Sequence, residues 1–353
     1  METGSTNPIA PEVTEDLRRT IETAGISDNA DLVARILATG IGMGLDRTDR
    51  LDLKITTAAL SEMRAAFRLF APFSDVPKVT IFGSARTKPD DAAYRQASDV
   101  AAALAGHGWM VVTGAGPGIM QAAAEGAGPD NSLGVSIRLP FEQRPNAIVE
   151  ANAHNVAMKY FFTRKLMLVK ESSGFVCVPG GFGTLDEMFE LLTLQQTGKA
   201  EPTPVVLLDE PGGTFWKGLE TFVHEHLETA GVISPHDFDR VVVTDSVEEA
   251  TAEIMGFWRN YDSMRWVGGR LVLRLKAAPT DAEIEELNER FPALLAEGRI
   301  ERTEALRVER EDDDKPELPR LVLRLNQWRV GELHRLIRAL NALPSAPAET
   351  AIQ

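Results

Sequence analysis

The sequence predicts an α/β protein whose core is a parallel sheet covered by helices on both faces. Three observations support this prediction: short, continuous apolar runs recur along the middle of the chain, helical segments alternate with them, and glycine-rich turns follow three of them. Strands that are buried on both faces are unbroken apolar runs, whereas strands with one wet face alternate apolar with polar residues. We therefore predict a Rossmann-like, doubly wound sheet over residues 76–265.

Strands and helices are expected to alternate through this core, as the βαβ units of a parallel sheet require. The expected strands are 78–84, 109–113, 133–139, 175–178, 204–208 and 241–244. The expected helices are 90–105, an alanine-rich segment ending near 127, 155–171, 185–196, 215–229 and 247–261.

The segment before the core, residues 1–75, is expected to form an N-terminal helical extension. Its clearest helix is 53–70, which has helical apolar spacing and strong helix formers. Pro72 and Pro77 mark its end, because proline cannot continue a helix.

The segment after the core, residues 266–345, is expected to form a small α+β appendage. The hexapeptide Arg-Leu-Val-Leu-Arg-Leu occurs at 270–275 and again at 320–325, and a helical pattern follows each copy. Between them, 299–308 is strand-like, so we interpret the segment as a degenerate βα repeat. The alternation of arginine with apolar residues predicts a sheet with one buried and one wet face. The chain is expected to fray from residue 344, with 346–353 as the tail.

Composition and charge exclude several classes of function. The 353 residues are 44% hydrophobic, which suffices for a core, and the formal net charge of −15 opposes binding to nucleic acid. The single cysteine, Cys177, forms no intrachain disulfide. No apolar run approaches the roughly 20 residues that span a bilayer, and the first residues do not resemble a secretory signal. We expect a cytoplasmic protein that binds neither nucleic acid nor a membrane.

The glycine-rich turns fall where ligands bind in open α/β sheets, at the carboxyl ends of strands. At least two of them open a helix, which directs backbone N–H groups at phosphate. The second turn, 114–118, is not a dinucleotide fingerprint, because Gly118 comes one residue early and Leu139 stands near the place of the expected acid. The alternative to a ligand site is that this segment is only a tight turn between a strand and a helix, with Pro117 in the first helical position. The candidate residues of the first two turns are Gly83, Ser84, Gly114, Gly116 and Gly118.

The third turn, Pro-Gly-Gly-Phe-Gly-Thr-Leu-Asp-Glu at 179–187, is more specific. Its glycines let the backbone approach a ligand closely. A structural alternative exists, because Thr184 and Glu187 have the spacing of a helix capping box. A ligand is favoured by the adjacent acids Asp186 and Glu187, which would repel an anion unless one has a function. The cationic pair 164–165 on the preceding helix also favours a ligand. The alternative interpretation of this pair is that it lies on a solvated helix face.

The segments 160–167 and 178–187 resemble the paired Arg-Lys and Pro-Gly-Gly-x-Gly-Thr-x-x-Glu motifs of the LOG ("lonely guy") family, once classed as lysine decarboxylases. The resemblance covers about 78–262. It implies a Rossmann-like fold and phosphoribohydrolase activity on nucleoside 5′-monophosphates, either AMP or cytokinin ribotides. It also implies a homodimer or larger assembly, because relatives complete the active site at a subunit interface. By motif position, Arg164 and Glu187 are the catalytic pair, and the phosphate is bound by Gly180, Gly181, Gly183 and Thr184.

The expected reaction is hydrolysis of an N-glycosidic bond through an oxocarbenium-like transition state. Glu187 would stabilise the developing charge and orient or deprotonate water, and Arg164 would hold the ligand. No metal or cofactor is expected, and Cys177 is expected to be inert packing.

Two positions depart from the family pattern. Ala115 stands where the family usually has glycine, and Phe161 stands where its short members have methionine, as in the longer bacterial members. The preferred base therefore stays open. The alternative function is a non-catalytic protein of the same fold that binds or senses a nucleotide or the molybdenum cofactor. Such a protein could dispense with Arg164 and Glu187.

Overall fold

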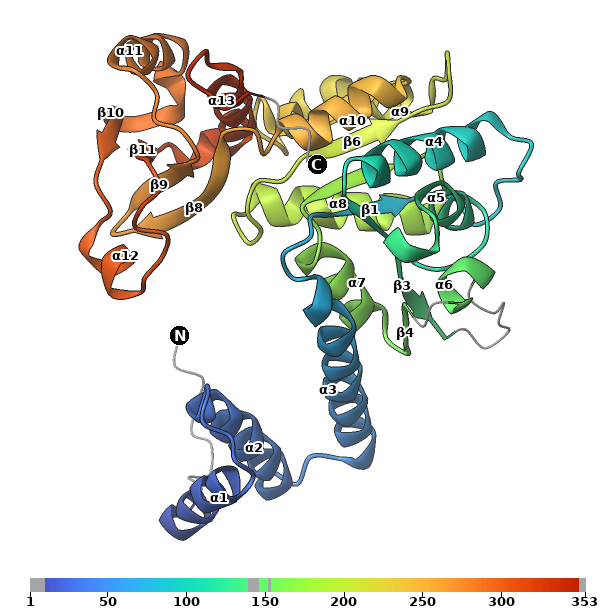
Figure 1. Cartoon of the computed structure of the whole chain (residues 1–353), viewed down its shortest axis with the longest axis vertical. Helices are drawn as coiled ribbons and strands as arrows, with labels where there is room; N and C mark the ends of the chain where they lie inside the picture. The colour runs from blue at the N-terminus through green and yellow to red at the C-terminus, as the bar shows by residue number, and fades with distance from the viewer. Residues whose placement is uncertain (1–9, 139–145, 152–153, 349–353) are drawn as a thin grey trace. The chain divides into compact units, whose positions relative to one another are not determined.

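The computed structural model describes residues 10–138, 146–151 and 154–348 (Figure 1). The chain divides into two compact units, Met1–Arg64 and Ala65–Gln353, and each is considered by itself.

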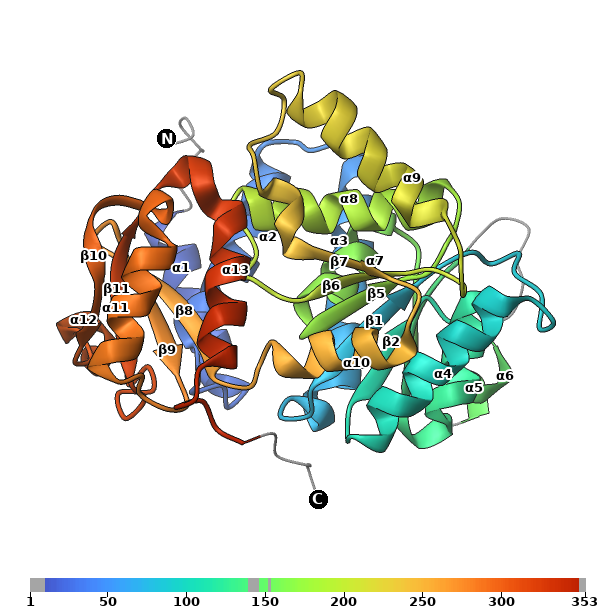
Figure 2. The ribbon, with the colours of Figure 1, turned by 90° about the horizontal axis from the view of Figure 1, so that it is seen from above.

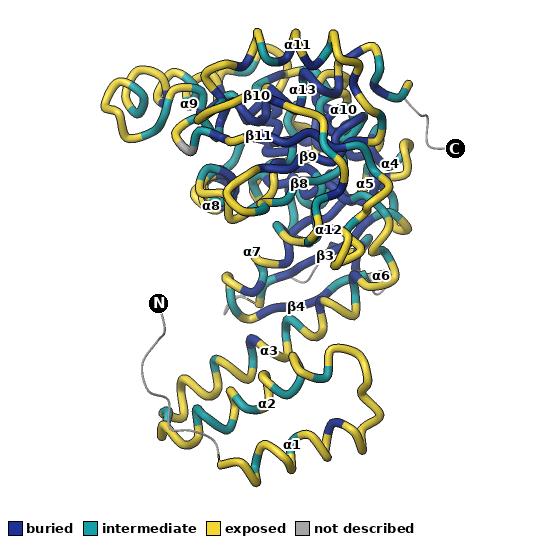
Figure 3. The backbone as a smooth tube through the Cα atoms, turned by 90° about the vertical axis from the view of Figure 1, so that its left-hand side faces the viewer, coloured by how far each residue is buried: buried dark blue, intermediate teal, exposed yellow. Residues whose placement is uncertain are grey.

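The N-terminal unit is helical, as predicted. It consists of α1 (Pro11–Thr23), α2 (Ala30–Leu45) and the start of α3 (Arg50–Phe70). Pro11 occupies the first turn of α1, where its missing N–H costs nothing. Exposed and half-buried residues dominate these helices, and Ile21 is the buried residue of α1 (Figure 3).

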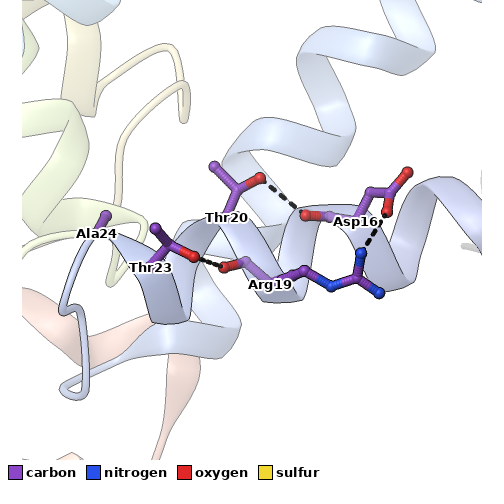
Figure 4. Close-up of a pocket in the computed structure, with 5 residues that line it drawn as sticks. All are labelled: Asp16, Arg19, Thr20, Thr23 and Ala24. Atoms are coloured by element: carbon purple, nitrogen blue, oxygen red, sulfur yellow. Dashed lines mark hydrogen bonds and ion pairs between the residues drawn. The ribbon is translucent and has the colours of Figure 1, made fainter.

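A shallow hollow lies along the last turns of α1 (Figure 4). The hydroxyl of Thr20 donates to the carbonyl of Asp16 at 2.8 Å, and that of Thr23 donates to the carbonyl of Arg19 at 2.7 Å. The guanidinium of Arg19 lies 3.7 Å from the carboxylate of Asp16. These polar side chains are engaged within their own helix, so the hollow is a surface feature of α1.

The C-terminal unit contains the predicted parallel sheet, which has seven strands in the order β4-β3-β2-β1-β5-β6-β7. Every neighbouring pair runs parallel. Most residues of these strands are buried, because helices cover both faces. The strands are β1 (Lys78–Phe82), β2 (Met110–Thr113), β3 (Ser132–Ile137), β4 (Asn155–Met158), β5 (Gly174–Cys177), β6 (Val205–Leu208) and β7 (Val241–Thr244).

Helices lie on both sides of the sheet, with α4, α5 and α10 on one side and α8 and α9 on the other (Figure 2). One hydrophobic cluster joins α4, α5 and α10 to the central strands. The helical segments are η1 (Ala71–Phe73), α4 (Ala92–Gly106), α5 (Ile119–Ala127), η2 (Pro129–Asn131), α6 (Ala147–Ala151), α7 (Phe161–Lys170), α8 (Phe182–Gln196), α9 (Phe215–Phe222), η3 (Val223–Glu228), η4 (Asp237–Arg240) and α10 (Val247–Gly256). The doubly wound α/β prediction is confirmed.

Three local predictions in the core were wrong. The expected helix 155–171 begins as strand β4, which pairs with β3 from Gly134 to Ile137, so only α7 is helical. Four residues are too few for periodicity to separate a strand from a helical turn, and pairing with β3 decides the outcome. Helix α5 begins after Gly118, so Pro117 is not its first residue. Helix α10 ends at Gly256, short of the predicted 261. Leu139 lies outside the described residues.

The appendage forms an antiparallel sheet in the order β10-β11-β9-β8. Both copies of the hexapeptide are strands, they pair with each other, and a helix follows each, which fits the predicted βα repeat. The strand β8 was not predicted, and its first residue, Tyr261, was assigned to the preceding helix. The elements are β8 (Tyr261–Val267), β9 (Arg270–Leu275), α11 (Asp281–Arg290), η5 (Pro292–Leu294), β10 (Leu295–Thr303), α12 (Arg307–Glu311), β11 (Arg320–Leu325), η6 (Gln327–Arg329) and α13 (Val330–Ala342).

The predicted wet face of this sheet was wrong for two of the four arginines in the repeat. Arg274 and Arg320 are 3% and 1% exposed, because α12 places Glu309 between them. The Glu309 carboxylate lies 2.8 Å from Nη2 of Arg274 and 3.3 Å from Nε of Arg320. Arg270 and Arg324 are exposed, as predicted.

The predicted fraying from residue 344 was also wrong for the residues that the structure describes. The backbone N–H of Ser345 donates to Glu283 at 3.0 Å, and the carbonyl of Pro347 accepts from Nε of Arg259 at 2.6 Å. Ahead of them, Asn341 in α13 accepts hydrogen bonds from the amides of Asn260 and Tyr261. These bonds hold residues 344–348 against the unit, whereas 349–353 lie outside the described residues.

Among the described residues, no helix has both the length and the apolar character to cross a membrane.

Candidate functional site

The three glycine-rich turns meet at one edge of the sheet. They follow β1, β2 and β5, which are neighbours in the order β2-β1-β5. The amide of Ile119, at the start of α5, donates to the carbonyl of Ser84 at 3.0 Å, which joins the first two turns. A Cβ atom built on Gly180 would lie 3.0 Å from the amide nitrogen of Ser84, so the third turn also abuts the first. The structure therefore brings the predicted turns together.

Two of the glycines leave room for neighbouring groups. Gly118 has a φ of +69°, and a Cβ atom there would lie 2.3 Å from the carbonyl oxygen of Ser84. At Gly114 a Cβ atom would lie 1.9 Å from Nη2 of Arg164. Gly114 is thus required by the close approach of Arg164, which links the second turn to the predicted catalytic pair. Ala115 adopts a φ of +56°, a left-handed conformation that favours glycine, which explains the family preference there.

The helix that follows the third turn begins earlier than predicted. α8 starts at Phe182, with Gly181 as its N-cap, and its first backbone bond runs from the amide of Leu185 to the carbonyl of Gly181 at 3.1 Å. Thr184 is therefore inside the helix, and the capping-box alternative is wrong. The first amides of a helix have no partners within it and attract anions. Apart from adjoining residues of the chain, no atom of the described residues lies within 4 Å of a Cβ built on Gly181 or Gly183, so this helix start is open.

Arg164 projects from the N-terminal half of α7. Its Nε donates to the carbonyl of Val135 in β3 at 2.9 Å, which fixes the guanidinium. Its Nη1 lies 3.8 Å from Oε1 of Glu187. Burial lowers the pKa of Arg164 and the Glu187 carboxylate opposes this, yet the guanidinium stays charged at neutral pH. The predicted pair is thus in contact.

Glu187 lies on α8 and is only 7% exposed. Burial raises its pKa to about 7, although the charges of Arg164 and Lys165 act to lower it. A carboxyl group that titrates near neutrality is suited to proton transfer. Such a shift, next to a specific charged partner, is typical of functional sites.

Lys165 has a different partner set from Arg164. Its ammonium lies 2.8 Å from the carboxylate of Asp186 and 2.7 Å from that of Glu190. Lys165 thus pairs with two acids near Glu187 on α8, so Asp186 has a cationic partner without a ligand. The sequence analysis missed Glu190, although Asp186 and Glu190 have the i, i+4 spacing of neighbours on one helix face.

Cys177 closes the strand that leads into the third turn. It is fully buried, and burial raises the pKa of its thiol. A buried, protonated thiol is unreactive, which agrees with the prediction that Cys177 is packing.

Large apolar side chains are exposed on the two helices that carry the pair. Phe182 at the start of α8 is 93% exposed, and Phe189 on α8 and Leu166 on α7 are exposed as well. Phe161 and Phe162, at the start of α7, are also exposed. The sequence analysis did not anticipate this apolar surface (Phe161, Phe162, Leu166, Phe182 and Phe189), because the same residues fit a buried helix face.

Comparison with known proteins gives the family. Residues 118–254 match a family model described as "possible lysine decarboxylase". The cytokinin riboside 5′-monophosphate phosphoribohydrolase of Mycobacterium tuberculosis is 33% identical over 156 residues, which cover 44% of this chain and 81% of that protein. The chain belongs to the LOG family. Another LOG protein, the cytokinin riboside 5′-monophosphate phosphoribohydrolase LOG1 of Arabidopsis thaliana, is 34% identical over 91 residues, 26% of this chain and 41% of that protein.

Solved structures similar to this LOG chain include the molybdenum cofactor binding protein of Rippkaea orientalis, with 22% identity and a TM-score of 0.35. That match covers 49% of this chain and 91% of the other. The molybdenum cofactor carrier protein of Chlamydomonas reinhardtii has 23% identity and a TM-score of 0.36, over 50% of this chain and 94% of that one.

Proposed function

We propose that this LOG protein hydrolyses the N-glycosidic bond of a nucleoside 5′-monophosphate, giving a free base and ribose 5-phosphate. Its curated relatives are phosphoribohydrolases, which are hydrolases that act on N-glycosyl bonds. The observation that carries the proposal is the buried contact of 3.8 Å between Arg164 and Glu187, beside the open start of α8.

The phosphate would bind at the start of α8. Gly180, Gly181 and Gly183 let it approach the backbone, and the first amides of α8 would donate to it. Thr184 lies in the same turn and would add its hydroxyl. The turns that contain Ser84 and Gly114 border this place and would face the ribose and the base.

The reaction needs an acid–base group whose ionised and protonated forms are both accessible near neutral pH. As a carboxylate, Glu187 would stabilise the oxocarbenium-like transition state and take a proton from the water that attacks the ribose carbon. The departing base would take up a proton in turn. Arg164, held by Val135, would keep the Glu187 carboxylate in position and donate to the ligand.

For the substrate, we propose AMP or a cytokinin riboside 5′-monophosphate. The phenylalanine at 161, in place of the methionine of short members, leaves the preferred base to experiment. Incubating the purified protein with a panel of nucleoside monophosphates, and separating the free bases by chromatography, would identify it.

Substitution of Glu187 tests the mechanism. We expect Glu187→Gln to abolish release of adenine from AMP, because glutamine cannot take a proton from water, while AMP binding survives. Glu289→Gln on the exposed surface of α11 is the matched control and should keep full activity. Full activity in Glu187→Gln would refute the assignment. Tight binding of AMP by the unmodified protein with no base released over hours would favour a nucleotide or cofactor sensor instead.

We also propose that the protein acts as a homodimer or a larger homo-oligomer. The apolar surface on α7 and α8 supports this proposal, because several large apolar side chains exposed on two helices are suited to burial in an interface.

A further inference from the structure

A second cavity lies at the opposite edge of the parallel sheet from the glycine-rich turns. Its volume is about 1150 Å³. Its wall includes Lys78, the first residue of β1, together with Trp109 and Ser173, which immediately precede β2 and β5. The glycine-rich turns follow the carboxyl ends of the same strands. The cavity is therefore separate from the candidate active site.

One side of the cavity is aromatic and held in place. Trp258, just beyond α10, donates its indole N–H to the carbonyl of Ser173 at 2.7 Å. Trp109 and Met255 also line the cavity. A fixed indole offers a flat apolar surface for a ring or an aliphatic chain.

The wall supplied by the appendage and the end of α10 carries an excess of positive charge. Arg259, Lys276 and Lys315 line it, against the single carboxylate of Asp262. The Lys315 ammonium lies 2.6 Å from Asp262. Lys276 donates to the carbonyl of Trp258 at 2.5 Å, and Arg259 donates its Nε to the carbonyl of Pro347 at 2.6 Å. Main-chain carbonyls orient these two cations without neutralising them.

Other charged groups also line the cavity. Lys78 directs its ammonium into the carbonyls of Phe73 and Val76, at 2.6 and 3.0 Å, and Lys170 pairs with Glu171 at 2.6 Å. The remaining charged groups there are the acids Asp75 and Glu248. Arg259, Lys276 and Lys315 are the cations of the lining that come from the end of α10 and from the appendage, beside Trp258.

We propose that this cavity binds a small oxyanion, a phosphate or a carboxylate compound, with its charged group on Arg259, Lys276 and Lys315 and its carbon skeleton against Trp258. A guanidinium carries several N–H donors in a fixed fork and an ammonium carries three, so each cation has donors to offer beyond the bond that already holds it. The volume of about 1150 Å³ exceeds the range of roughly 300–1,000 Å³ for small-molecule sites, so a small compound has room to enter.

The test titrates the intact protein with inorganic pyrophosphate and, separately, with citrate, followed by calorimetry and tryptophan fluorescence. We expect one of the two to bind and to change the fluorescence, since Trp109 and Trp258 line the cavity. Pyrophosphate would indicate a phosphate ligand, and citrate a carboxylate. The double variant Lys276→Gln/Lys315→Gln should weaken this binding by about tenfold or more, because two charge-assisted hydrogen bonds are lost.

The matched control is Lys199→Gln/Lys217→Gln, which removes two exposed ammonium groups elsewhere and should bind as the unmodified protein does. Arg259→Lys is a milder second variant, which keeps the charge but loses the fork, and should also weaken binding. The proposal is wrong if neither anion binds. It is equally wrong if the double variant binds as tightly as the unmodified protein, because the anion would then occupy the start of α8.

Discussion

At the scale of single residues, the buried carboxyl group of Glu187 decides how the site responds to pH. Its burial opposes ionisation, whereas Arg164 at 3.8 Å and the ammonium of Lys165 favour it. Burial is the larger effect, so the pKa rises to about 7. We therefore expect this group to influence both the proposed reaction and the stability of the fold.

Base release should depend on pH through this group. If Glu187 works as a carboxylate, kcat/KM for AMP should rise with pH and level off above about 7. A profile that is flat from pH 5 to 9, or that levels off at the ordinary pKa of a glutamate, would contradict this role.

Stability should respond in the opposite direction. A carboxyl group whose pKa is raised in the folded state stabilises the fold fully below its unfolded pKa, and this contribution is lost as pH rises through the folded value. Between the ordinary 4.5 and about 7, the free energy of unfolding should fall by up to about 1.4 kcal/mol per pH unit relative to Glu187→Gln. Denaturant unfolding of both proteins at pH 5 and pH 8 measures the difference, and equal pH dependence would argue against a buried carboxyl group.

Ala115 is the second residue with a measurable consequence. Its left-handed φ of +56° costs an L-residue about 1–2 kcal/mol, part of which glycine regains. Ala115→Gly should stabilise the protein by up to about 1 kcal/mol in denaturant unfolding. Ala122→Gly, at a buried helical position of α5, is the control and should destabilise it by about 1 kcal/mol or more. Destabilisation by both changes would show that packing of the Ala115 methyl group outweighs the backbone strain.

At the scale of elements, α12 converts a repeated strand sequence into a buried ionic centre. Its Glu309 is completely buried between Arg274 and Arg320, which occupy the neighbouring strands β9 and β11. Glu309 pairs with both arginines, and Arg274 also pairs with Asp314, so opposite charge compensates the buried guanidinium groups.

Glu309→Gln should therefore destabilise the fold strongly. Removing one partner leaves buried charge uncompensated, for which about 3–5 kcal/mol is expected. Thermal or denaturant unfolding measures the loss. Glu297→Gln is the matched control, because Glu297 pairs with Arg324 on the exposed surface and should change stability by less than about 1 kcal/mol. A loss as small as that of the control would mean that Arg274 and Arg320 find other partners.

The sequence was informative about elements that have strong local patterns. The continuous apolar strands, the long helices and the βα repeat were predictable, because burial on both faces and turn residues produce recognisable patterns in the sequence. The strand β4 was not, since four residues at the edge of the sheet are specified by pairing with β3. The buried state of Arg274 was not predictable either, because its partner Glu309 is distant in sequence.

The site was predictable in composition but not in geometry. The motifs identified Arg164 and Glu187, whereas the bond from Arg164 to Val135 and the pairing of Lys165 with Glu190 depend on how α7 and α8 pack. The start of α8 was misplaced because Thr184 and Glu187 imitate a capping box, while the actual N-cap, Gly181, has no side chain.

At the scale of the whole molecule, the division into 1–75, 76–265, 266–345 and 346–353 remains a proposal. Phe257 and Tyr261, from the end of α10 and the start of β8, belong to the hydrophobic cluster of the appendage. The hydrogen bonds that Asn341 accepts from the amides of Asn260 and Tyr261 strengthen this junction. We therefore expect the appendage and the parallel sheet to unfold together.

Self-association should depend on the apolar surface of α7 and α8. Native mass spectrometry should find the unmodified protein as a dimer or larger. Phe162→Ser/Phe182→Ser should shift it towards monomer, because both side chains are exposed in the single chain and would be buried in an assembly. Phe222→Ser on α9, which removes a similarly exposed ring, should leave the mass unchanged. A monomeric unmodified protein, or an unaltered assembly in the double variant, would overturn the proposal.

Because Cys177 is buried, a label can be attached selectively to a cysteine that is introduced elsewhere in the chain. It is the single cysteine of the sequence, and burial keeps its thiol protonated and shielded. A cysteine introduced at an exposed position, such as Lys217 on α9, would react with a maleimide dye far faster than the native thiol. Spectroscopic reporters can thus be placed one at a time on the native sequence, without first replacing a residue behind the third glycine-rich turn.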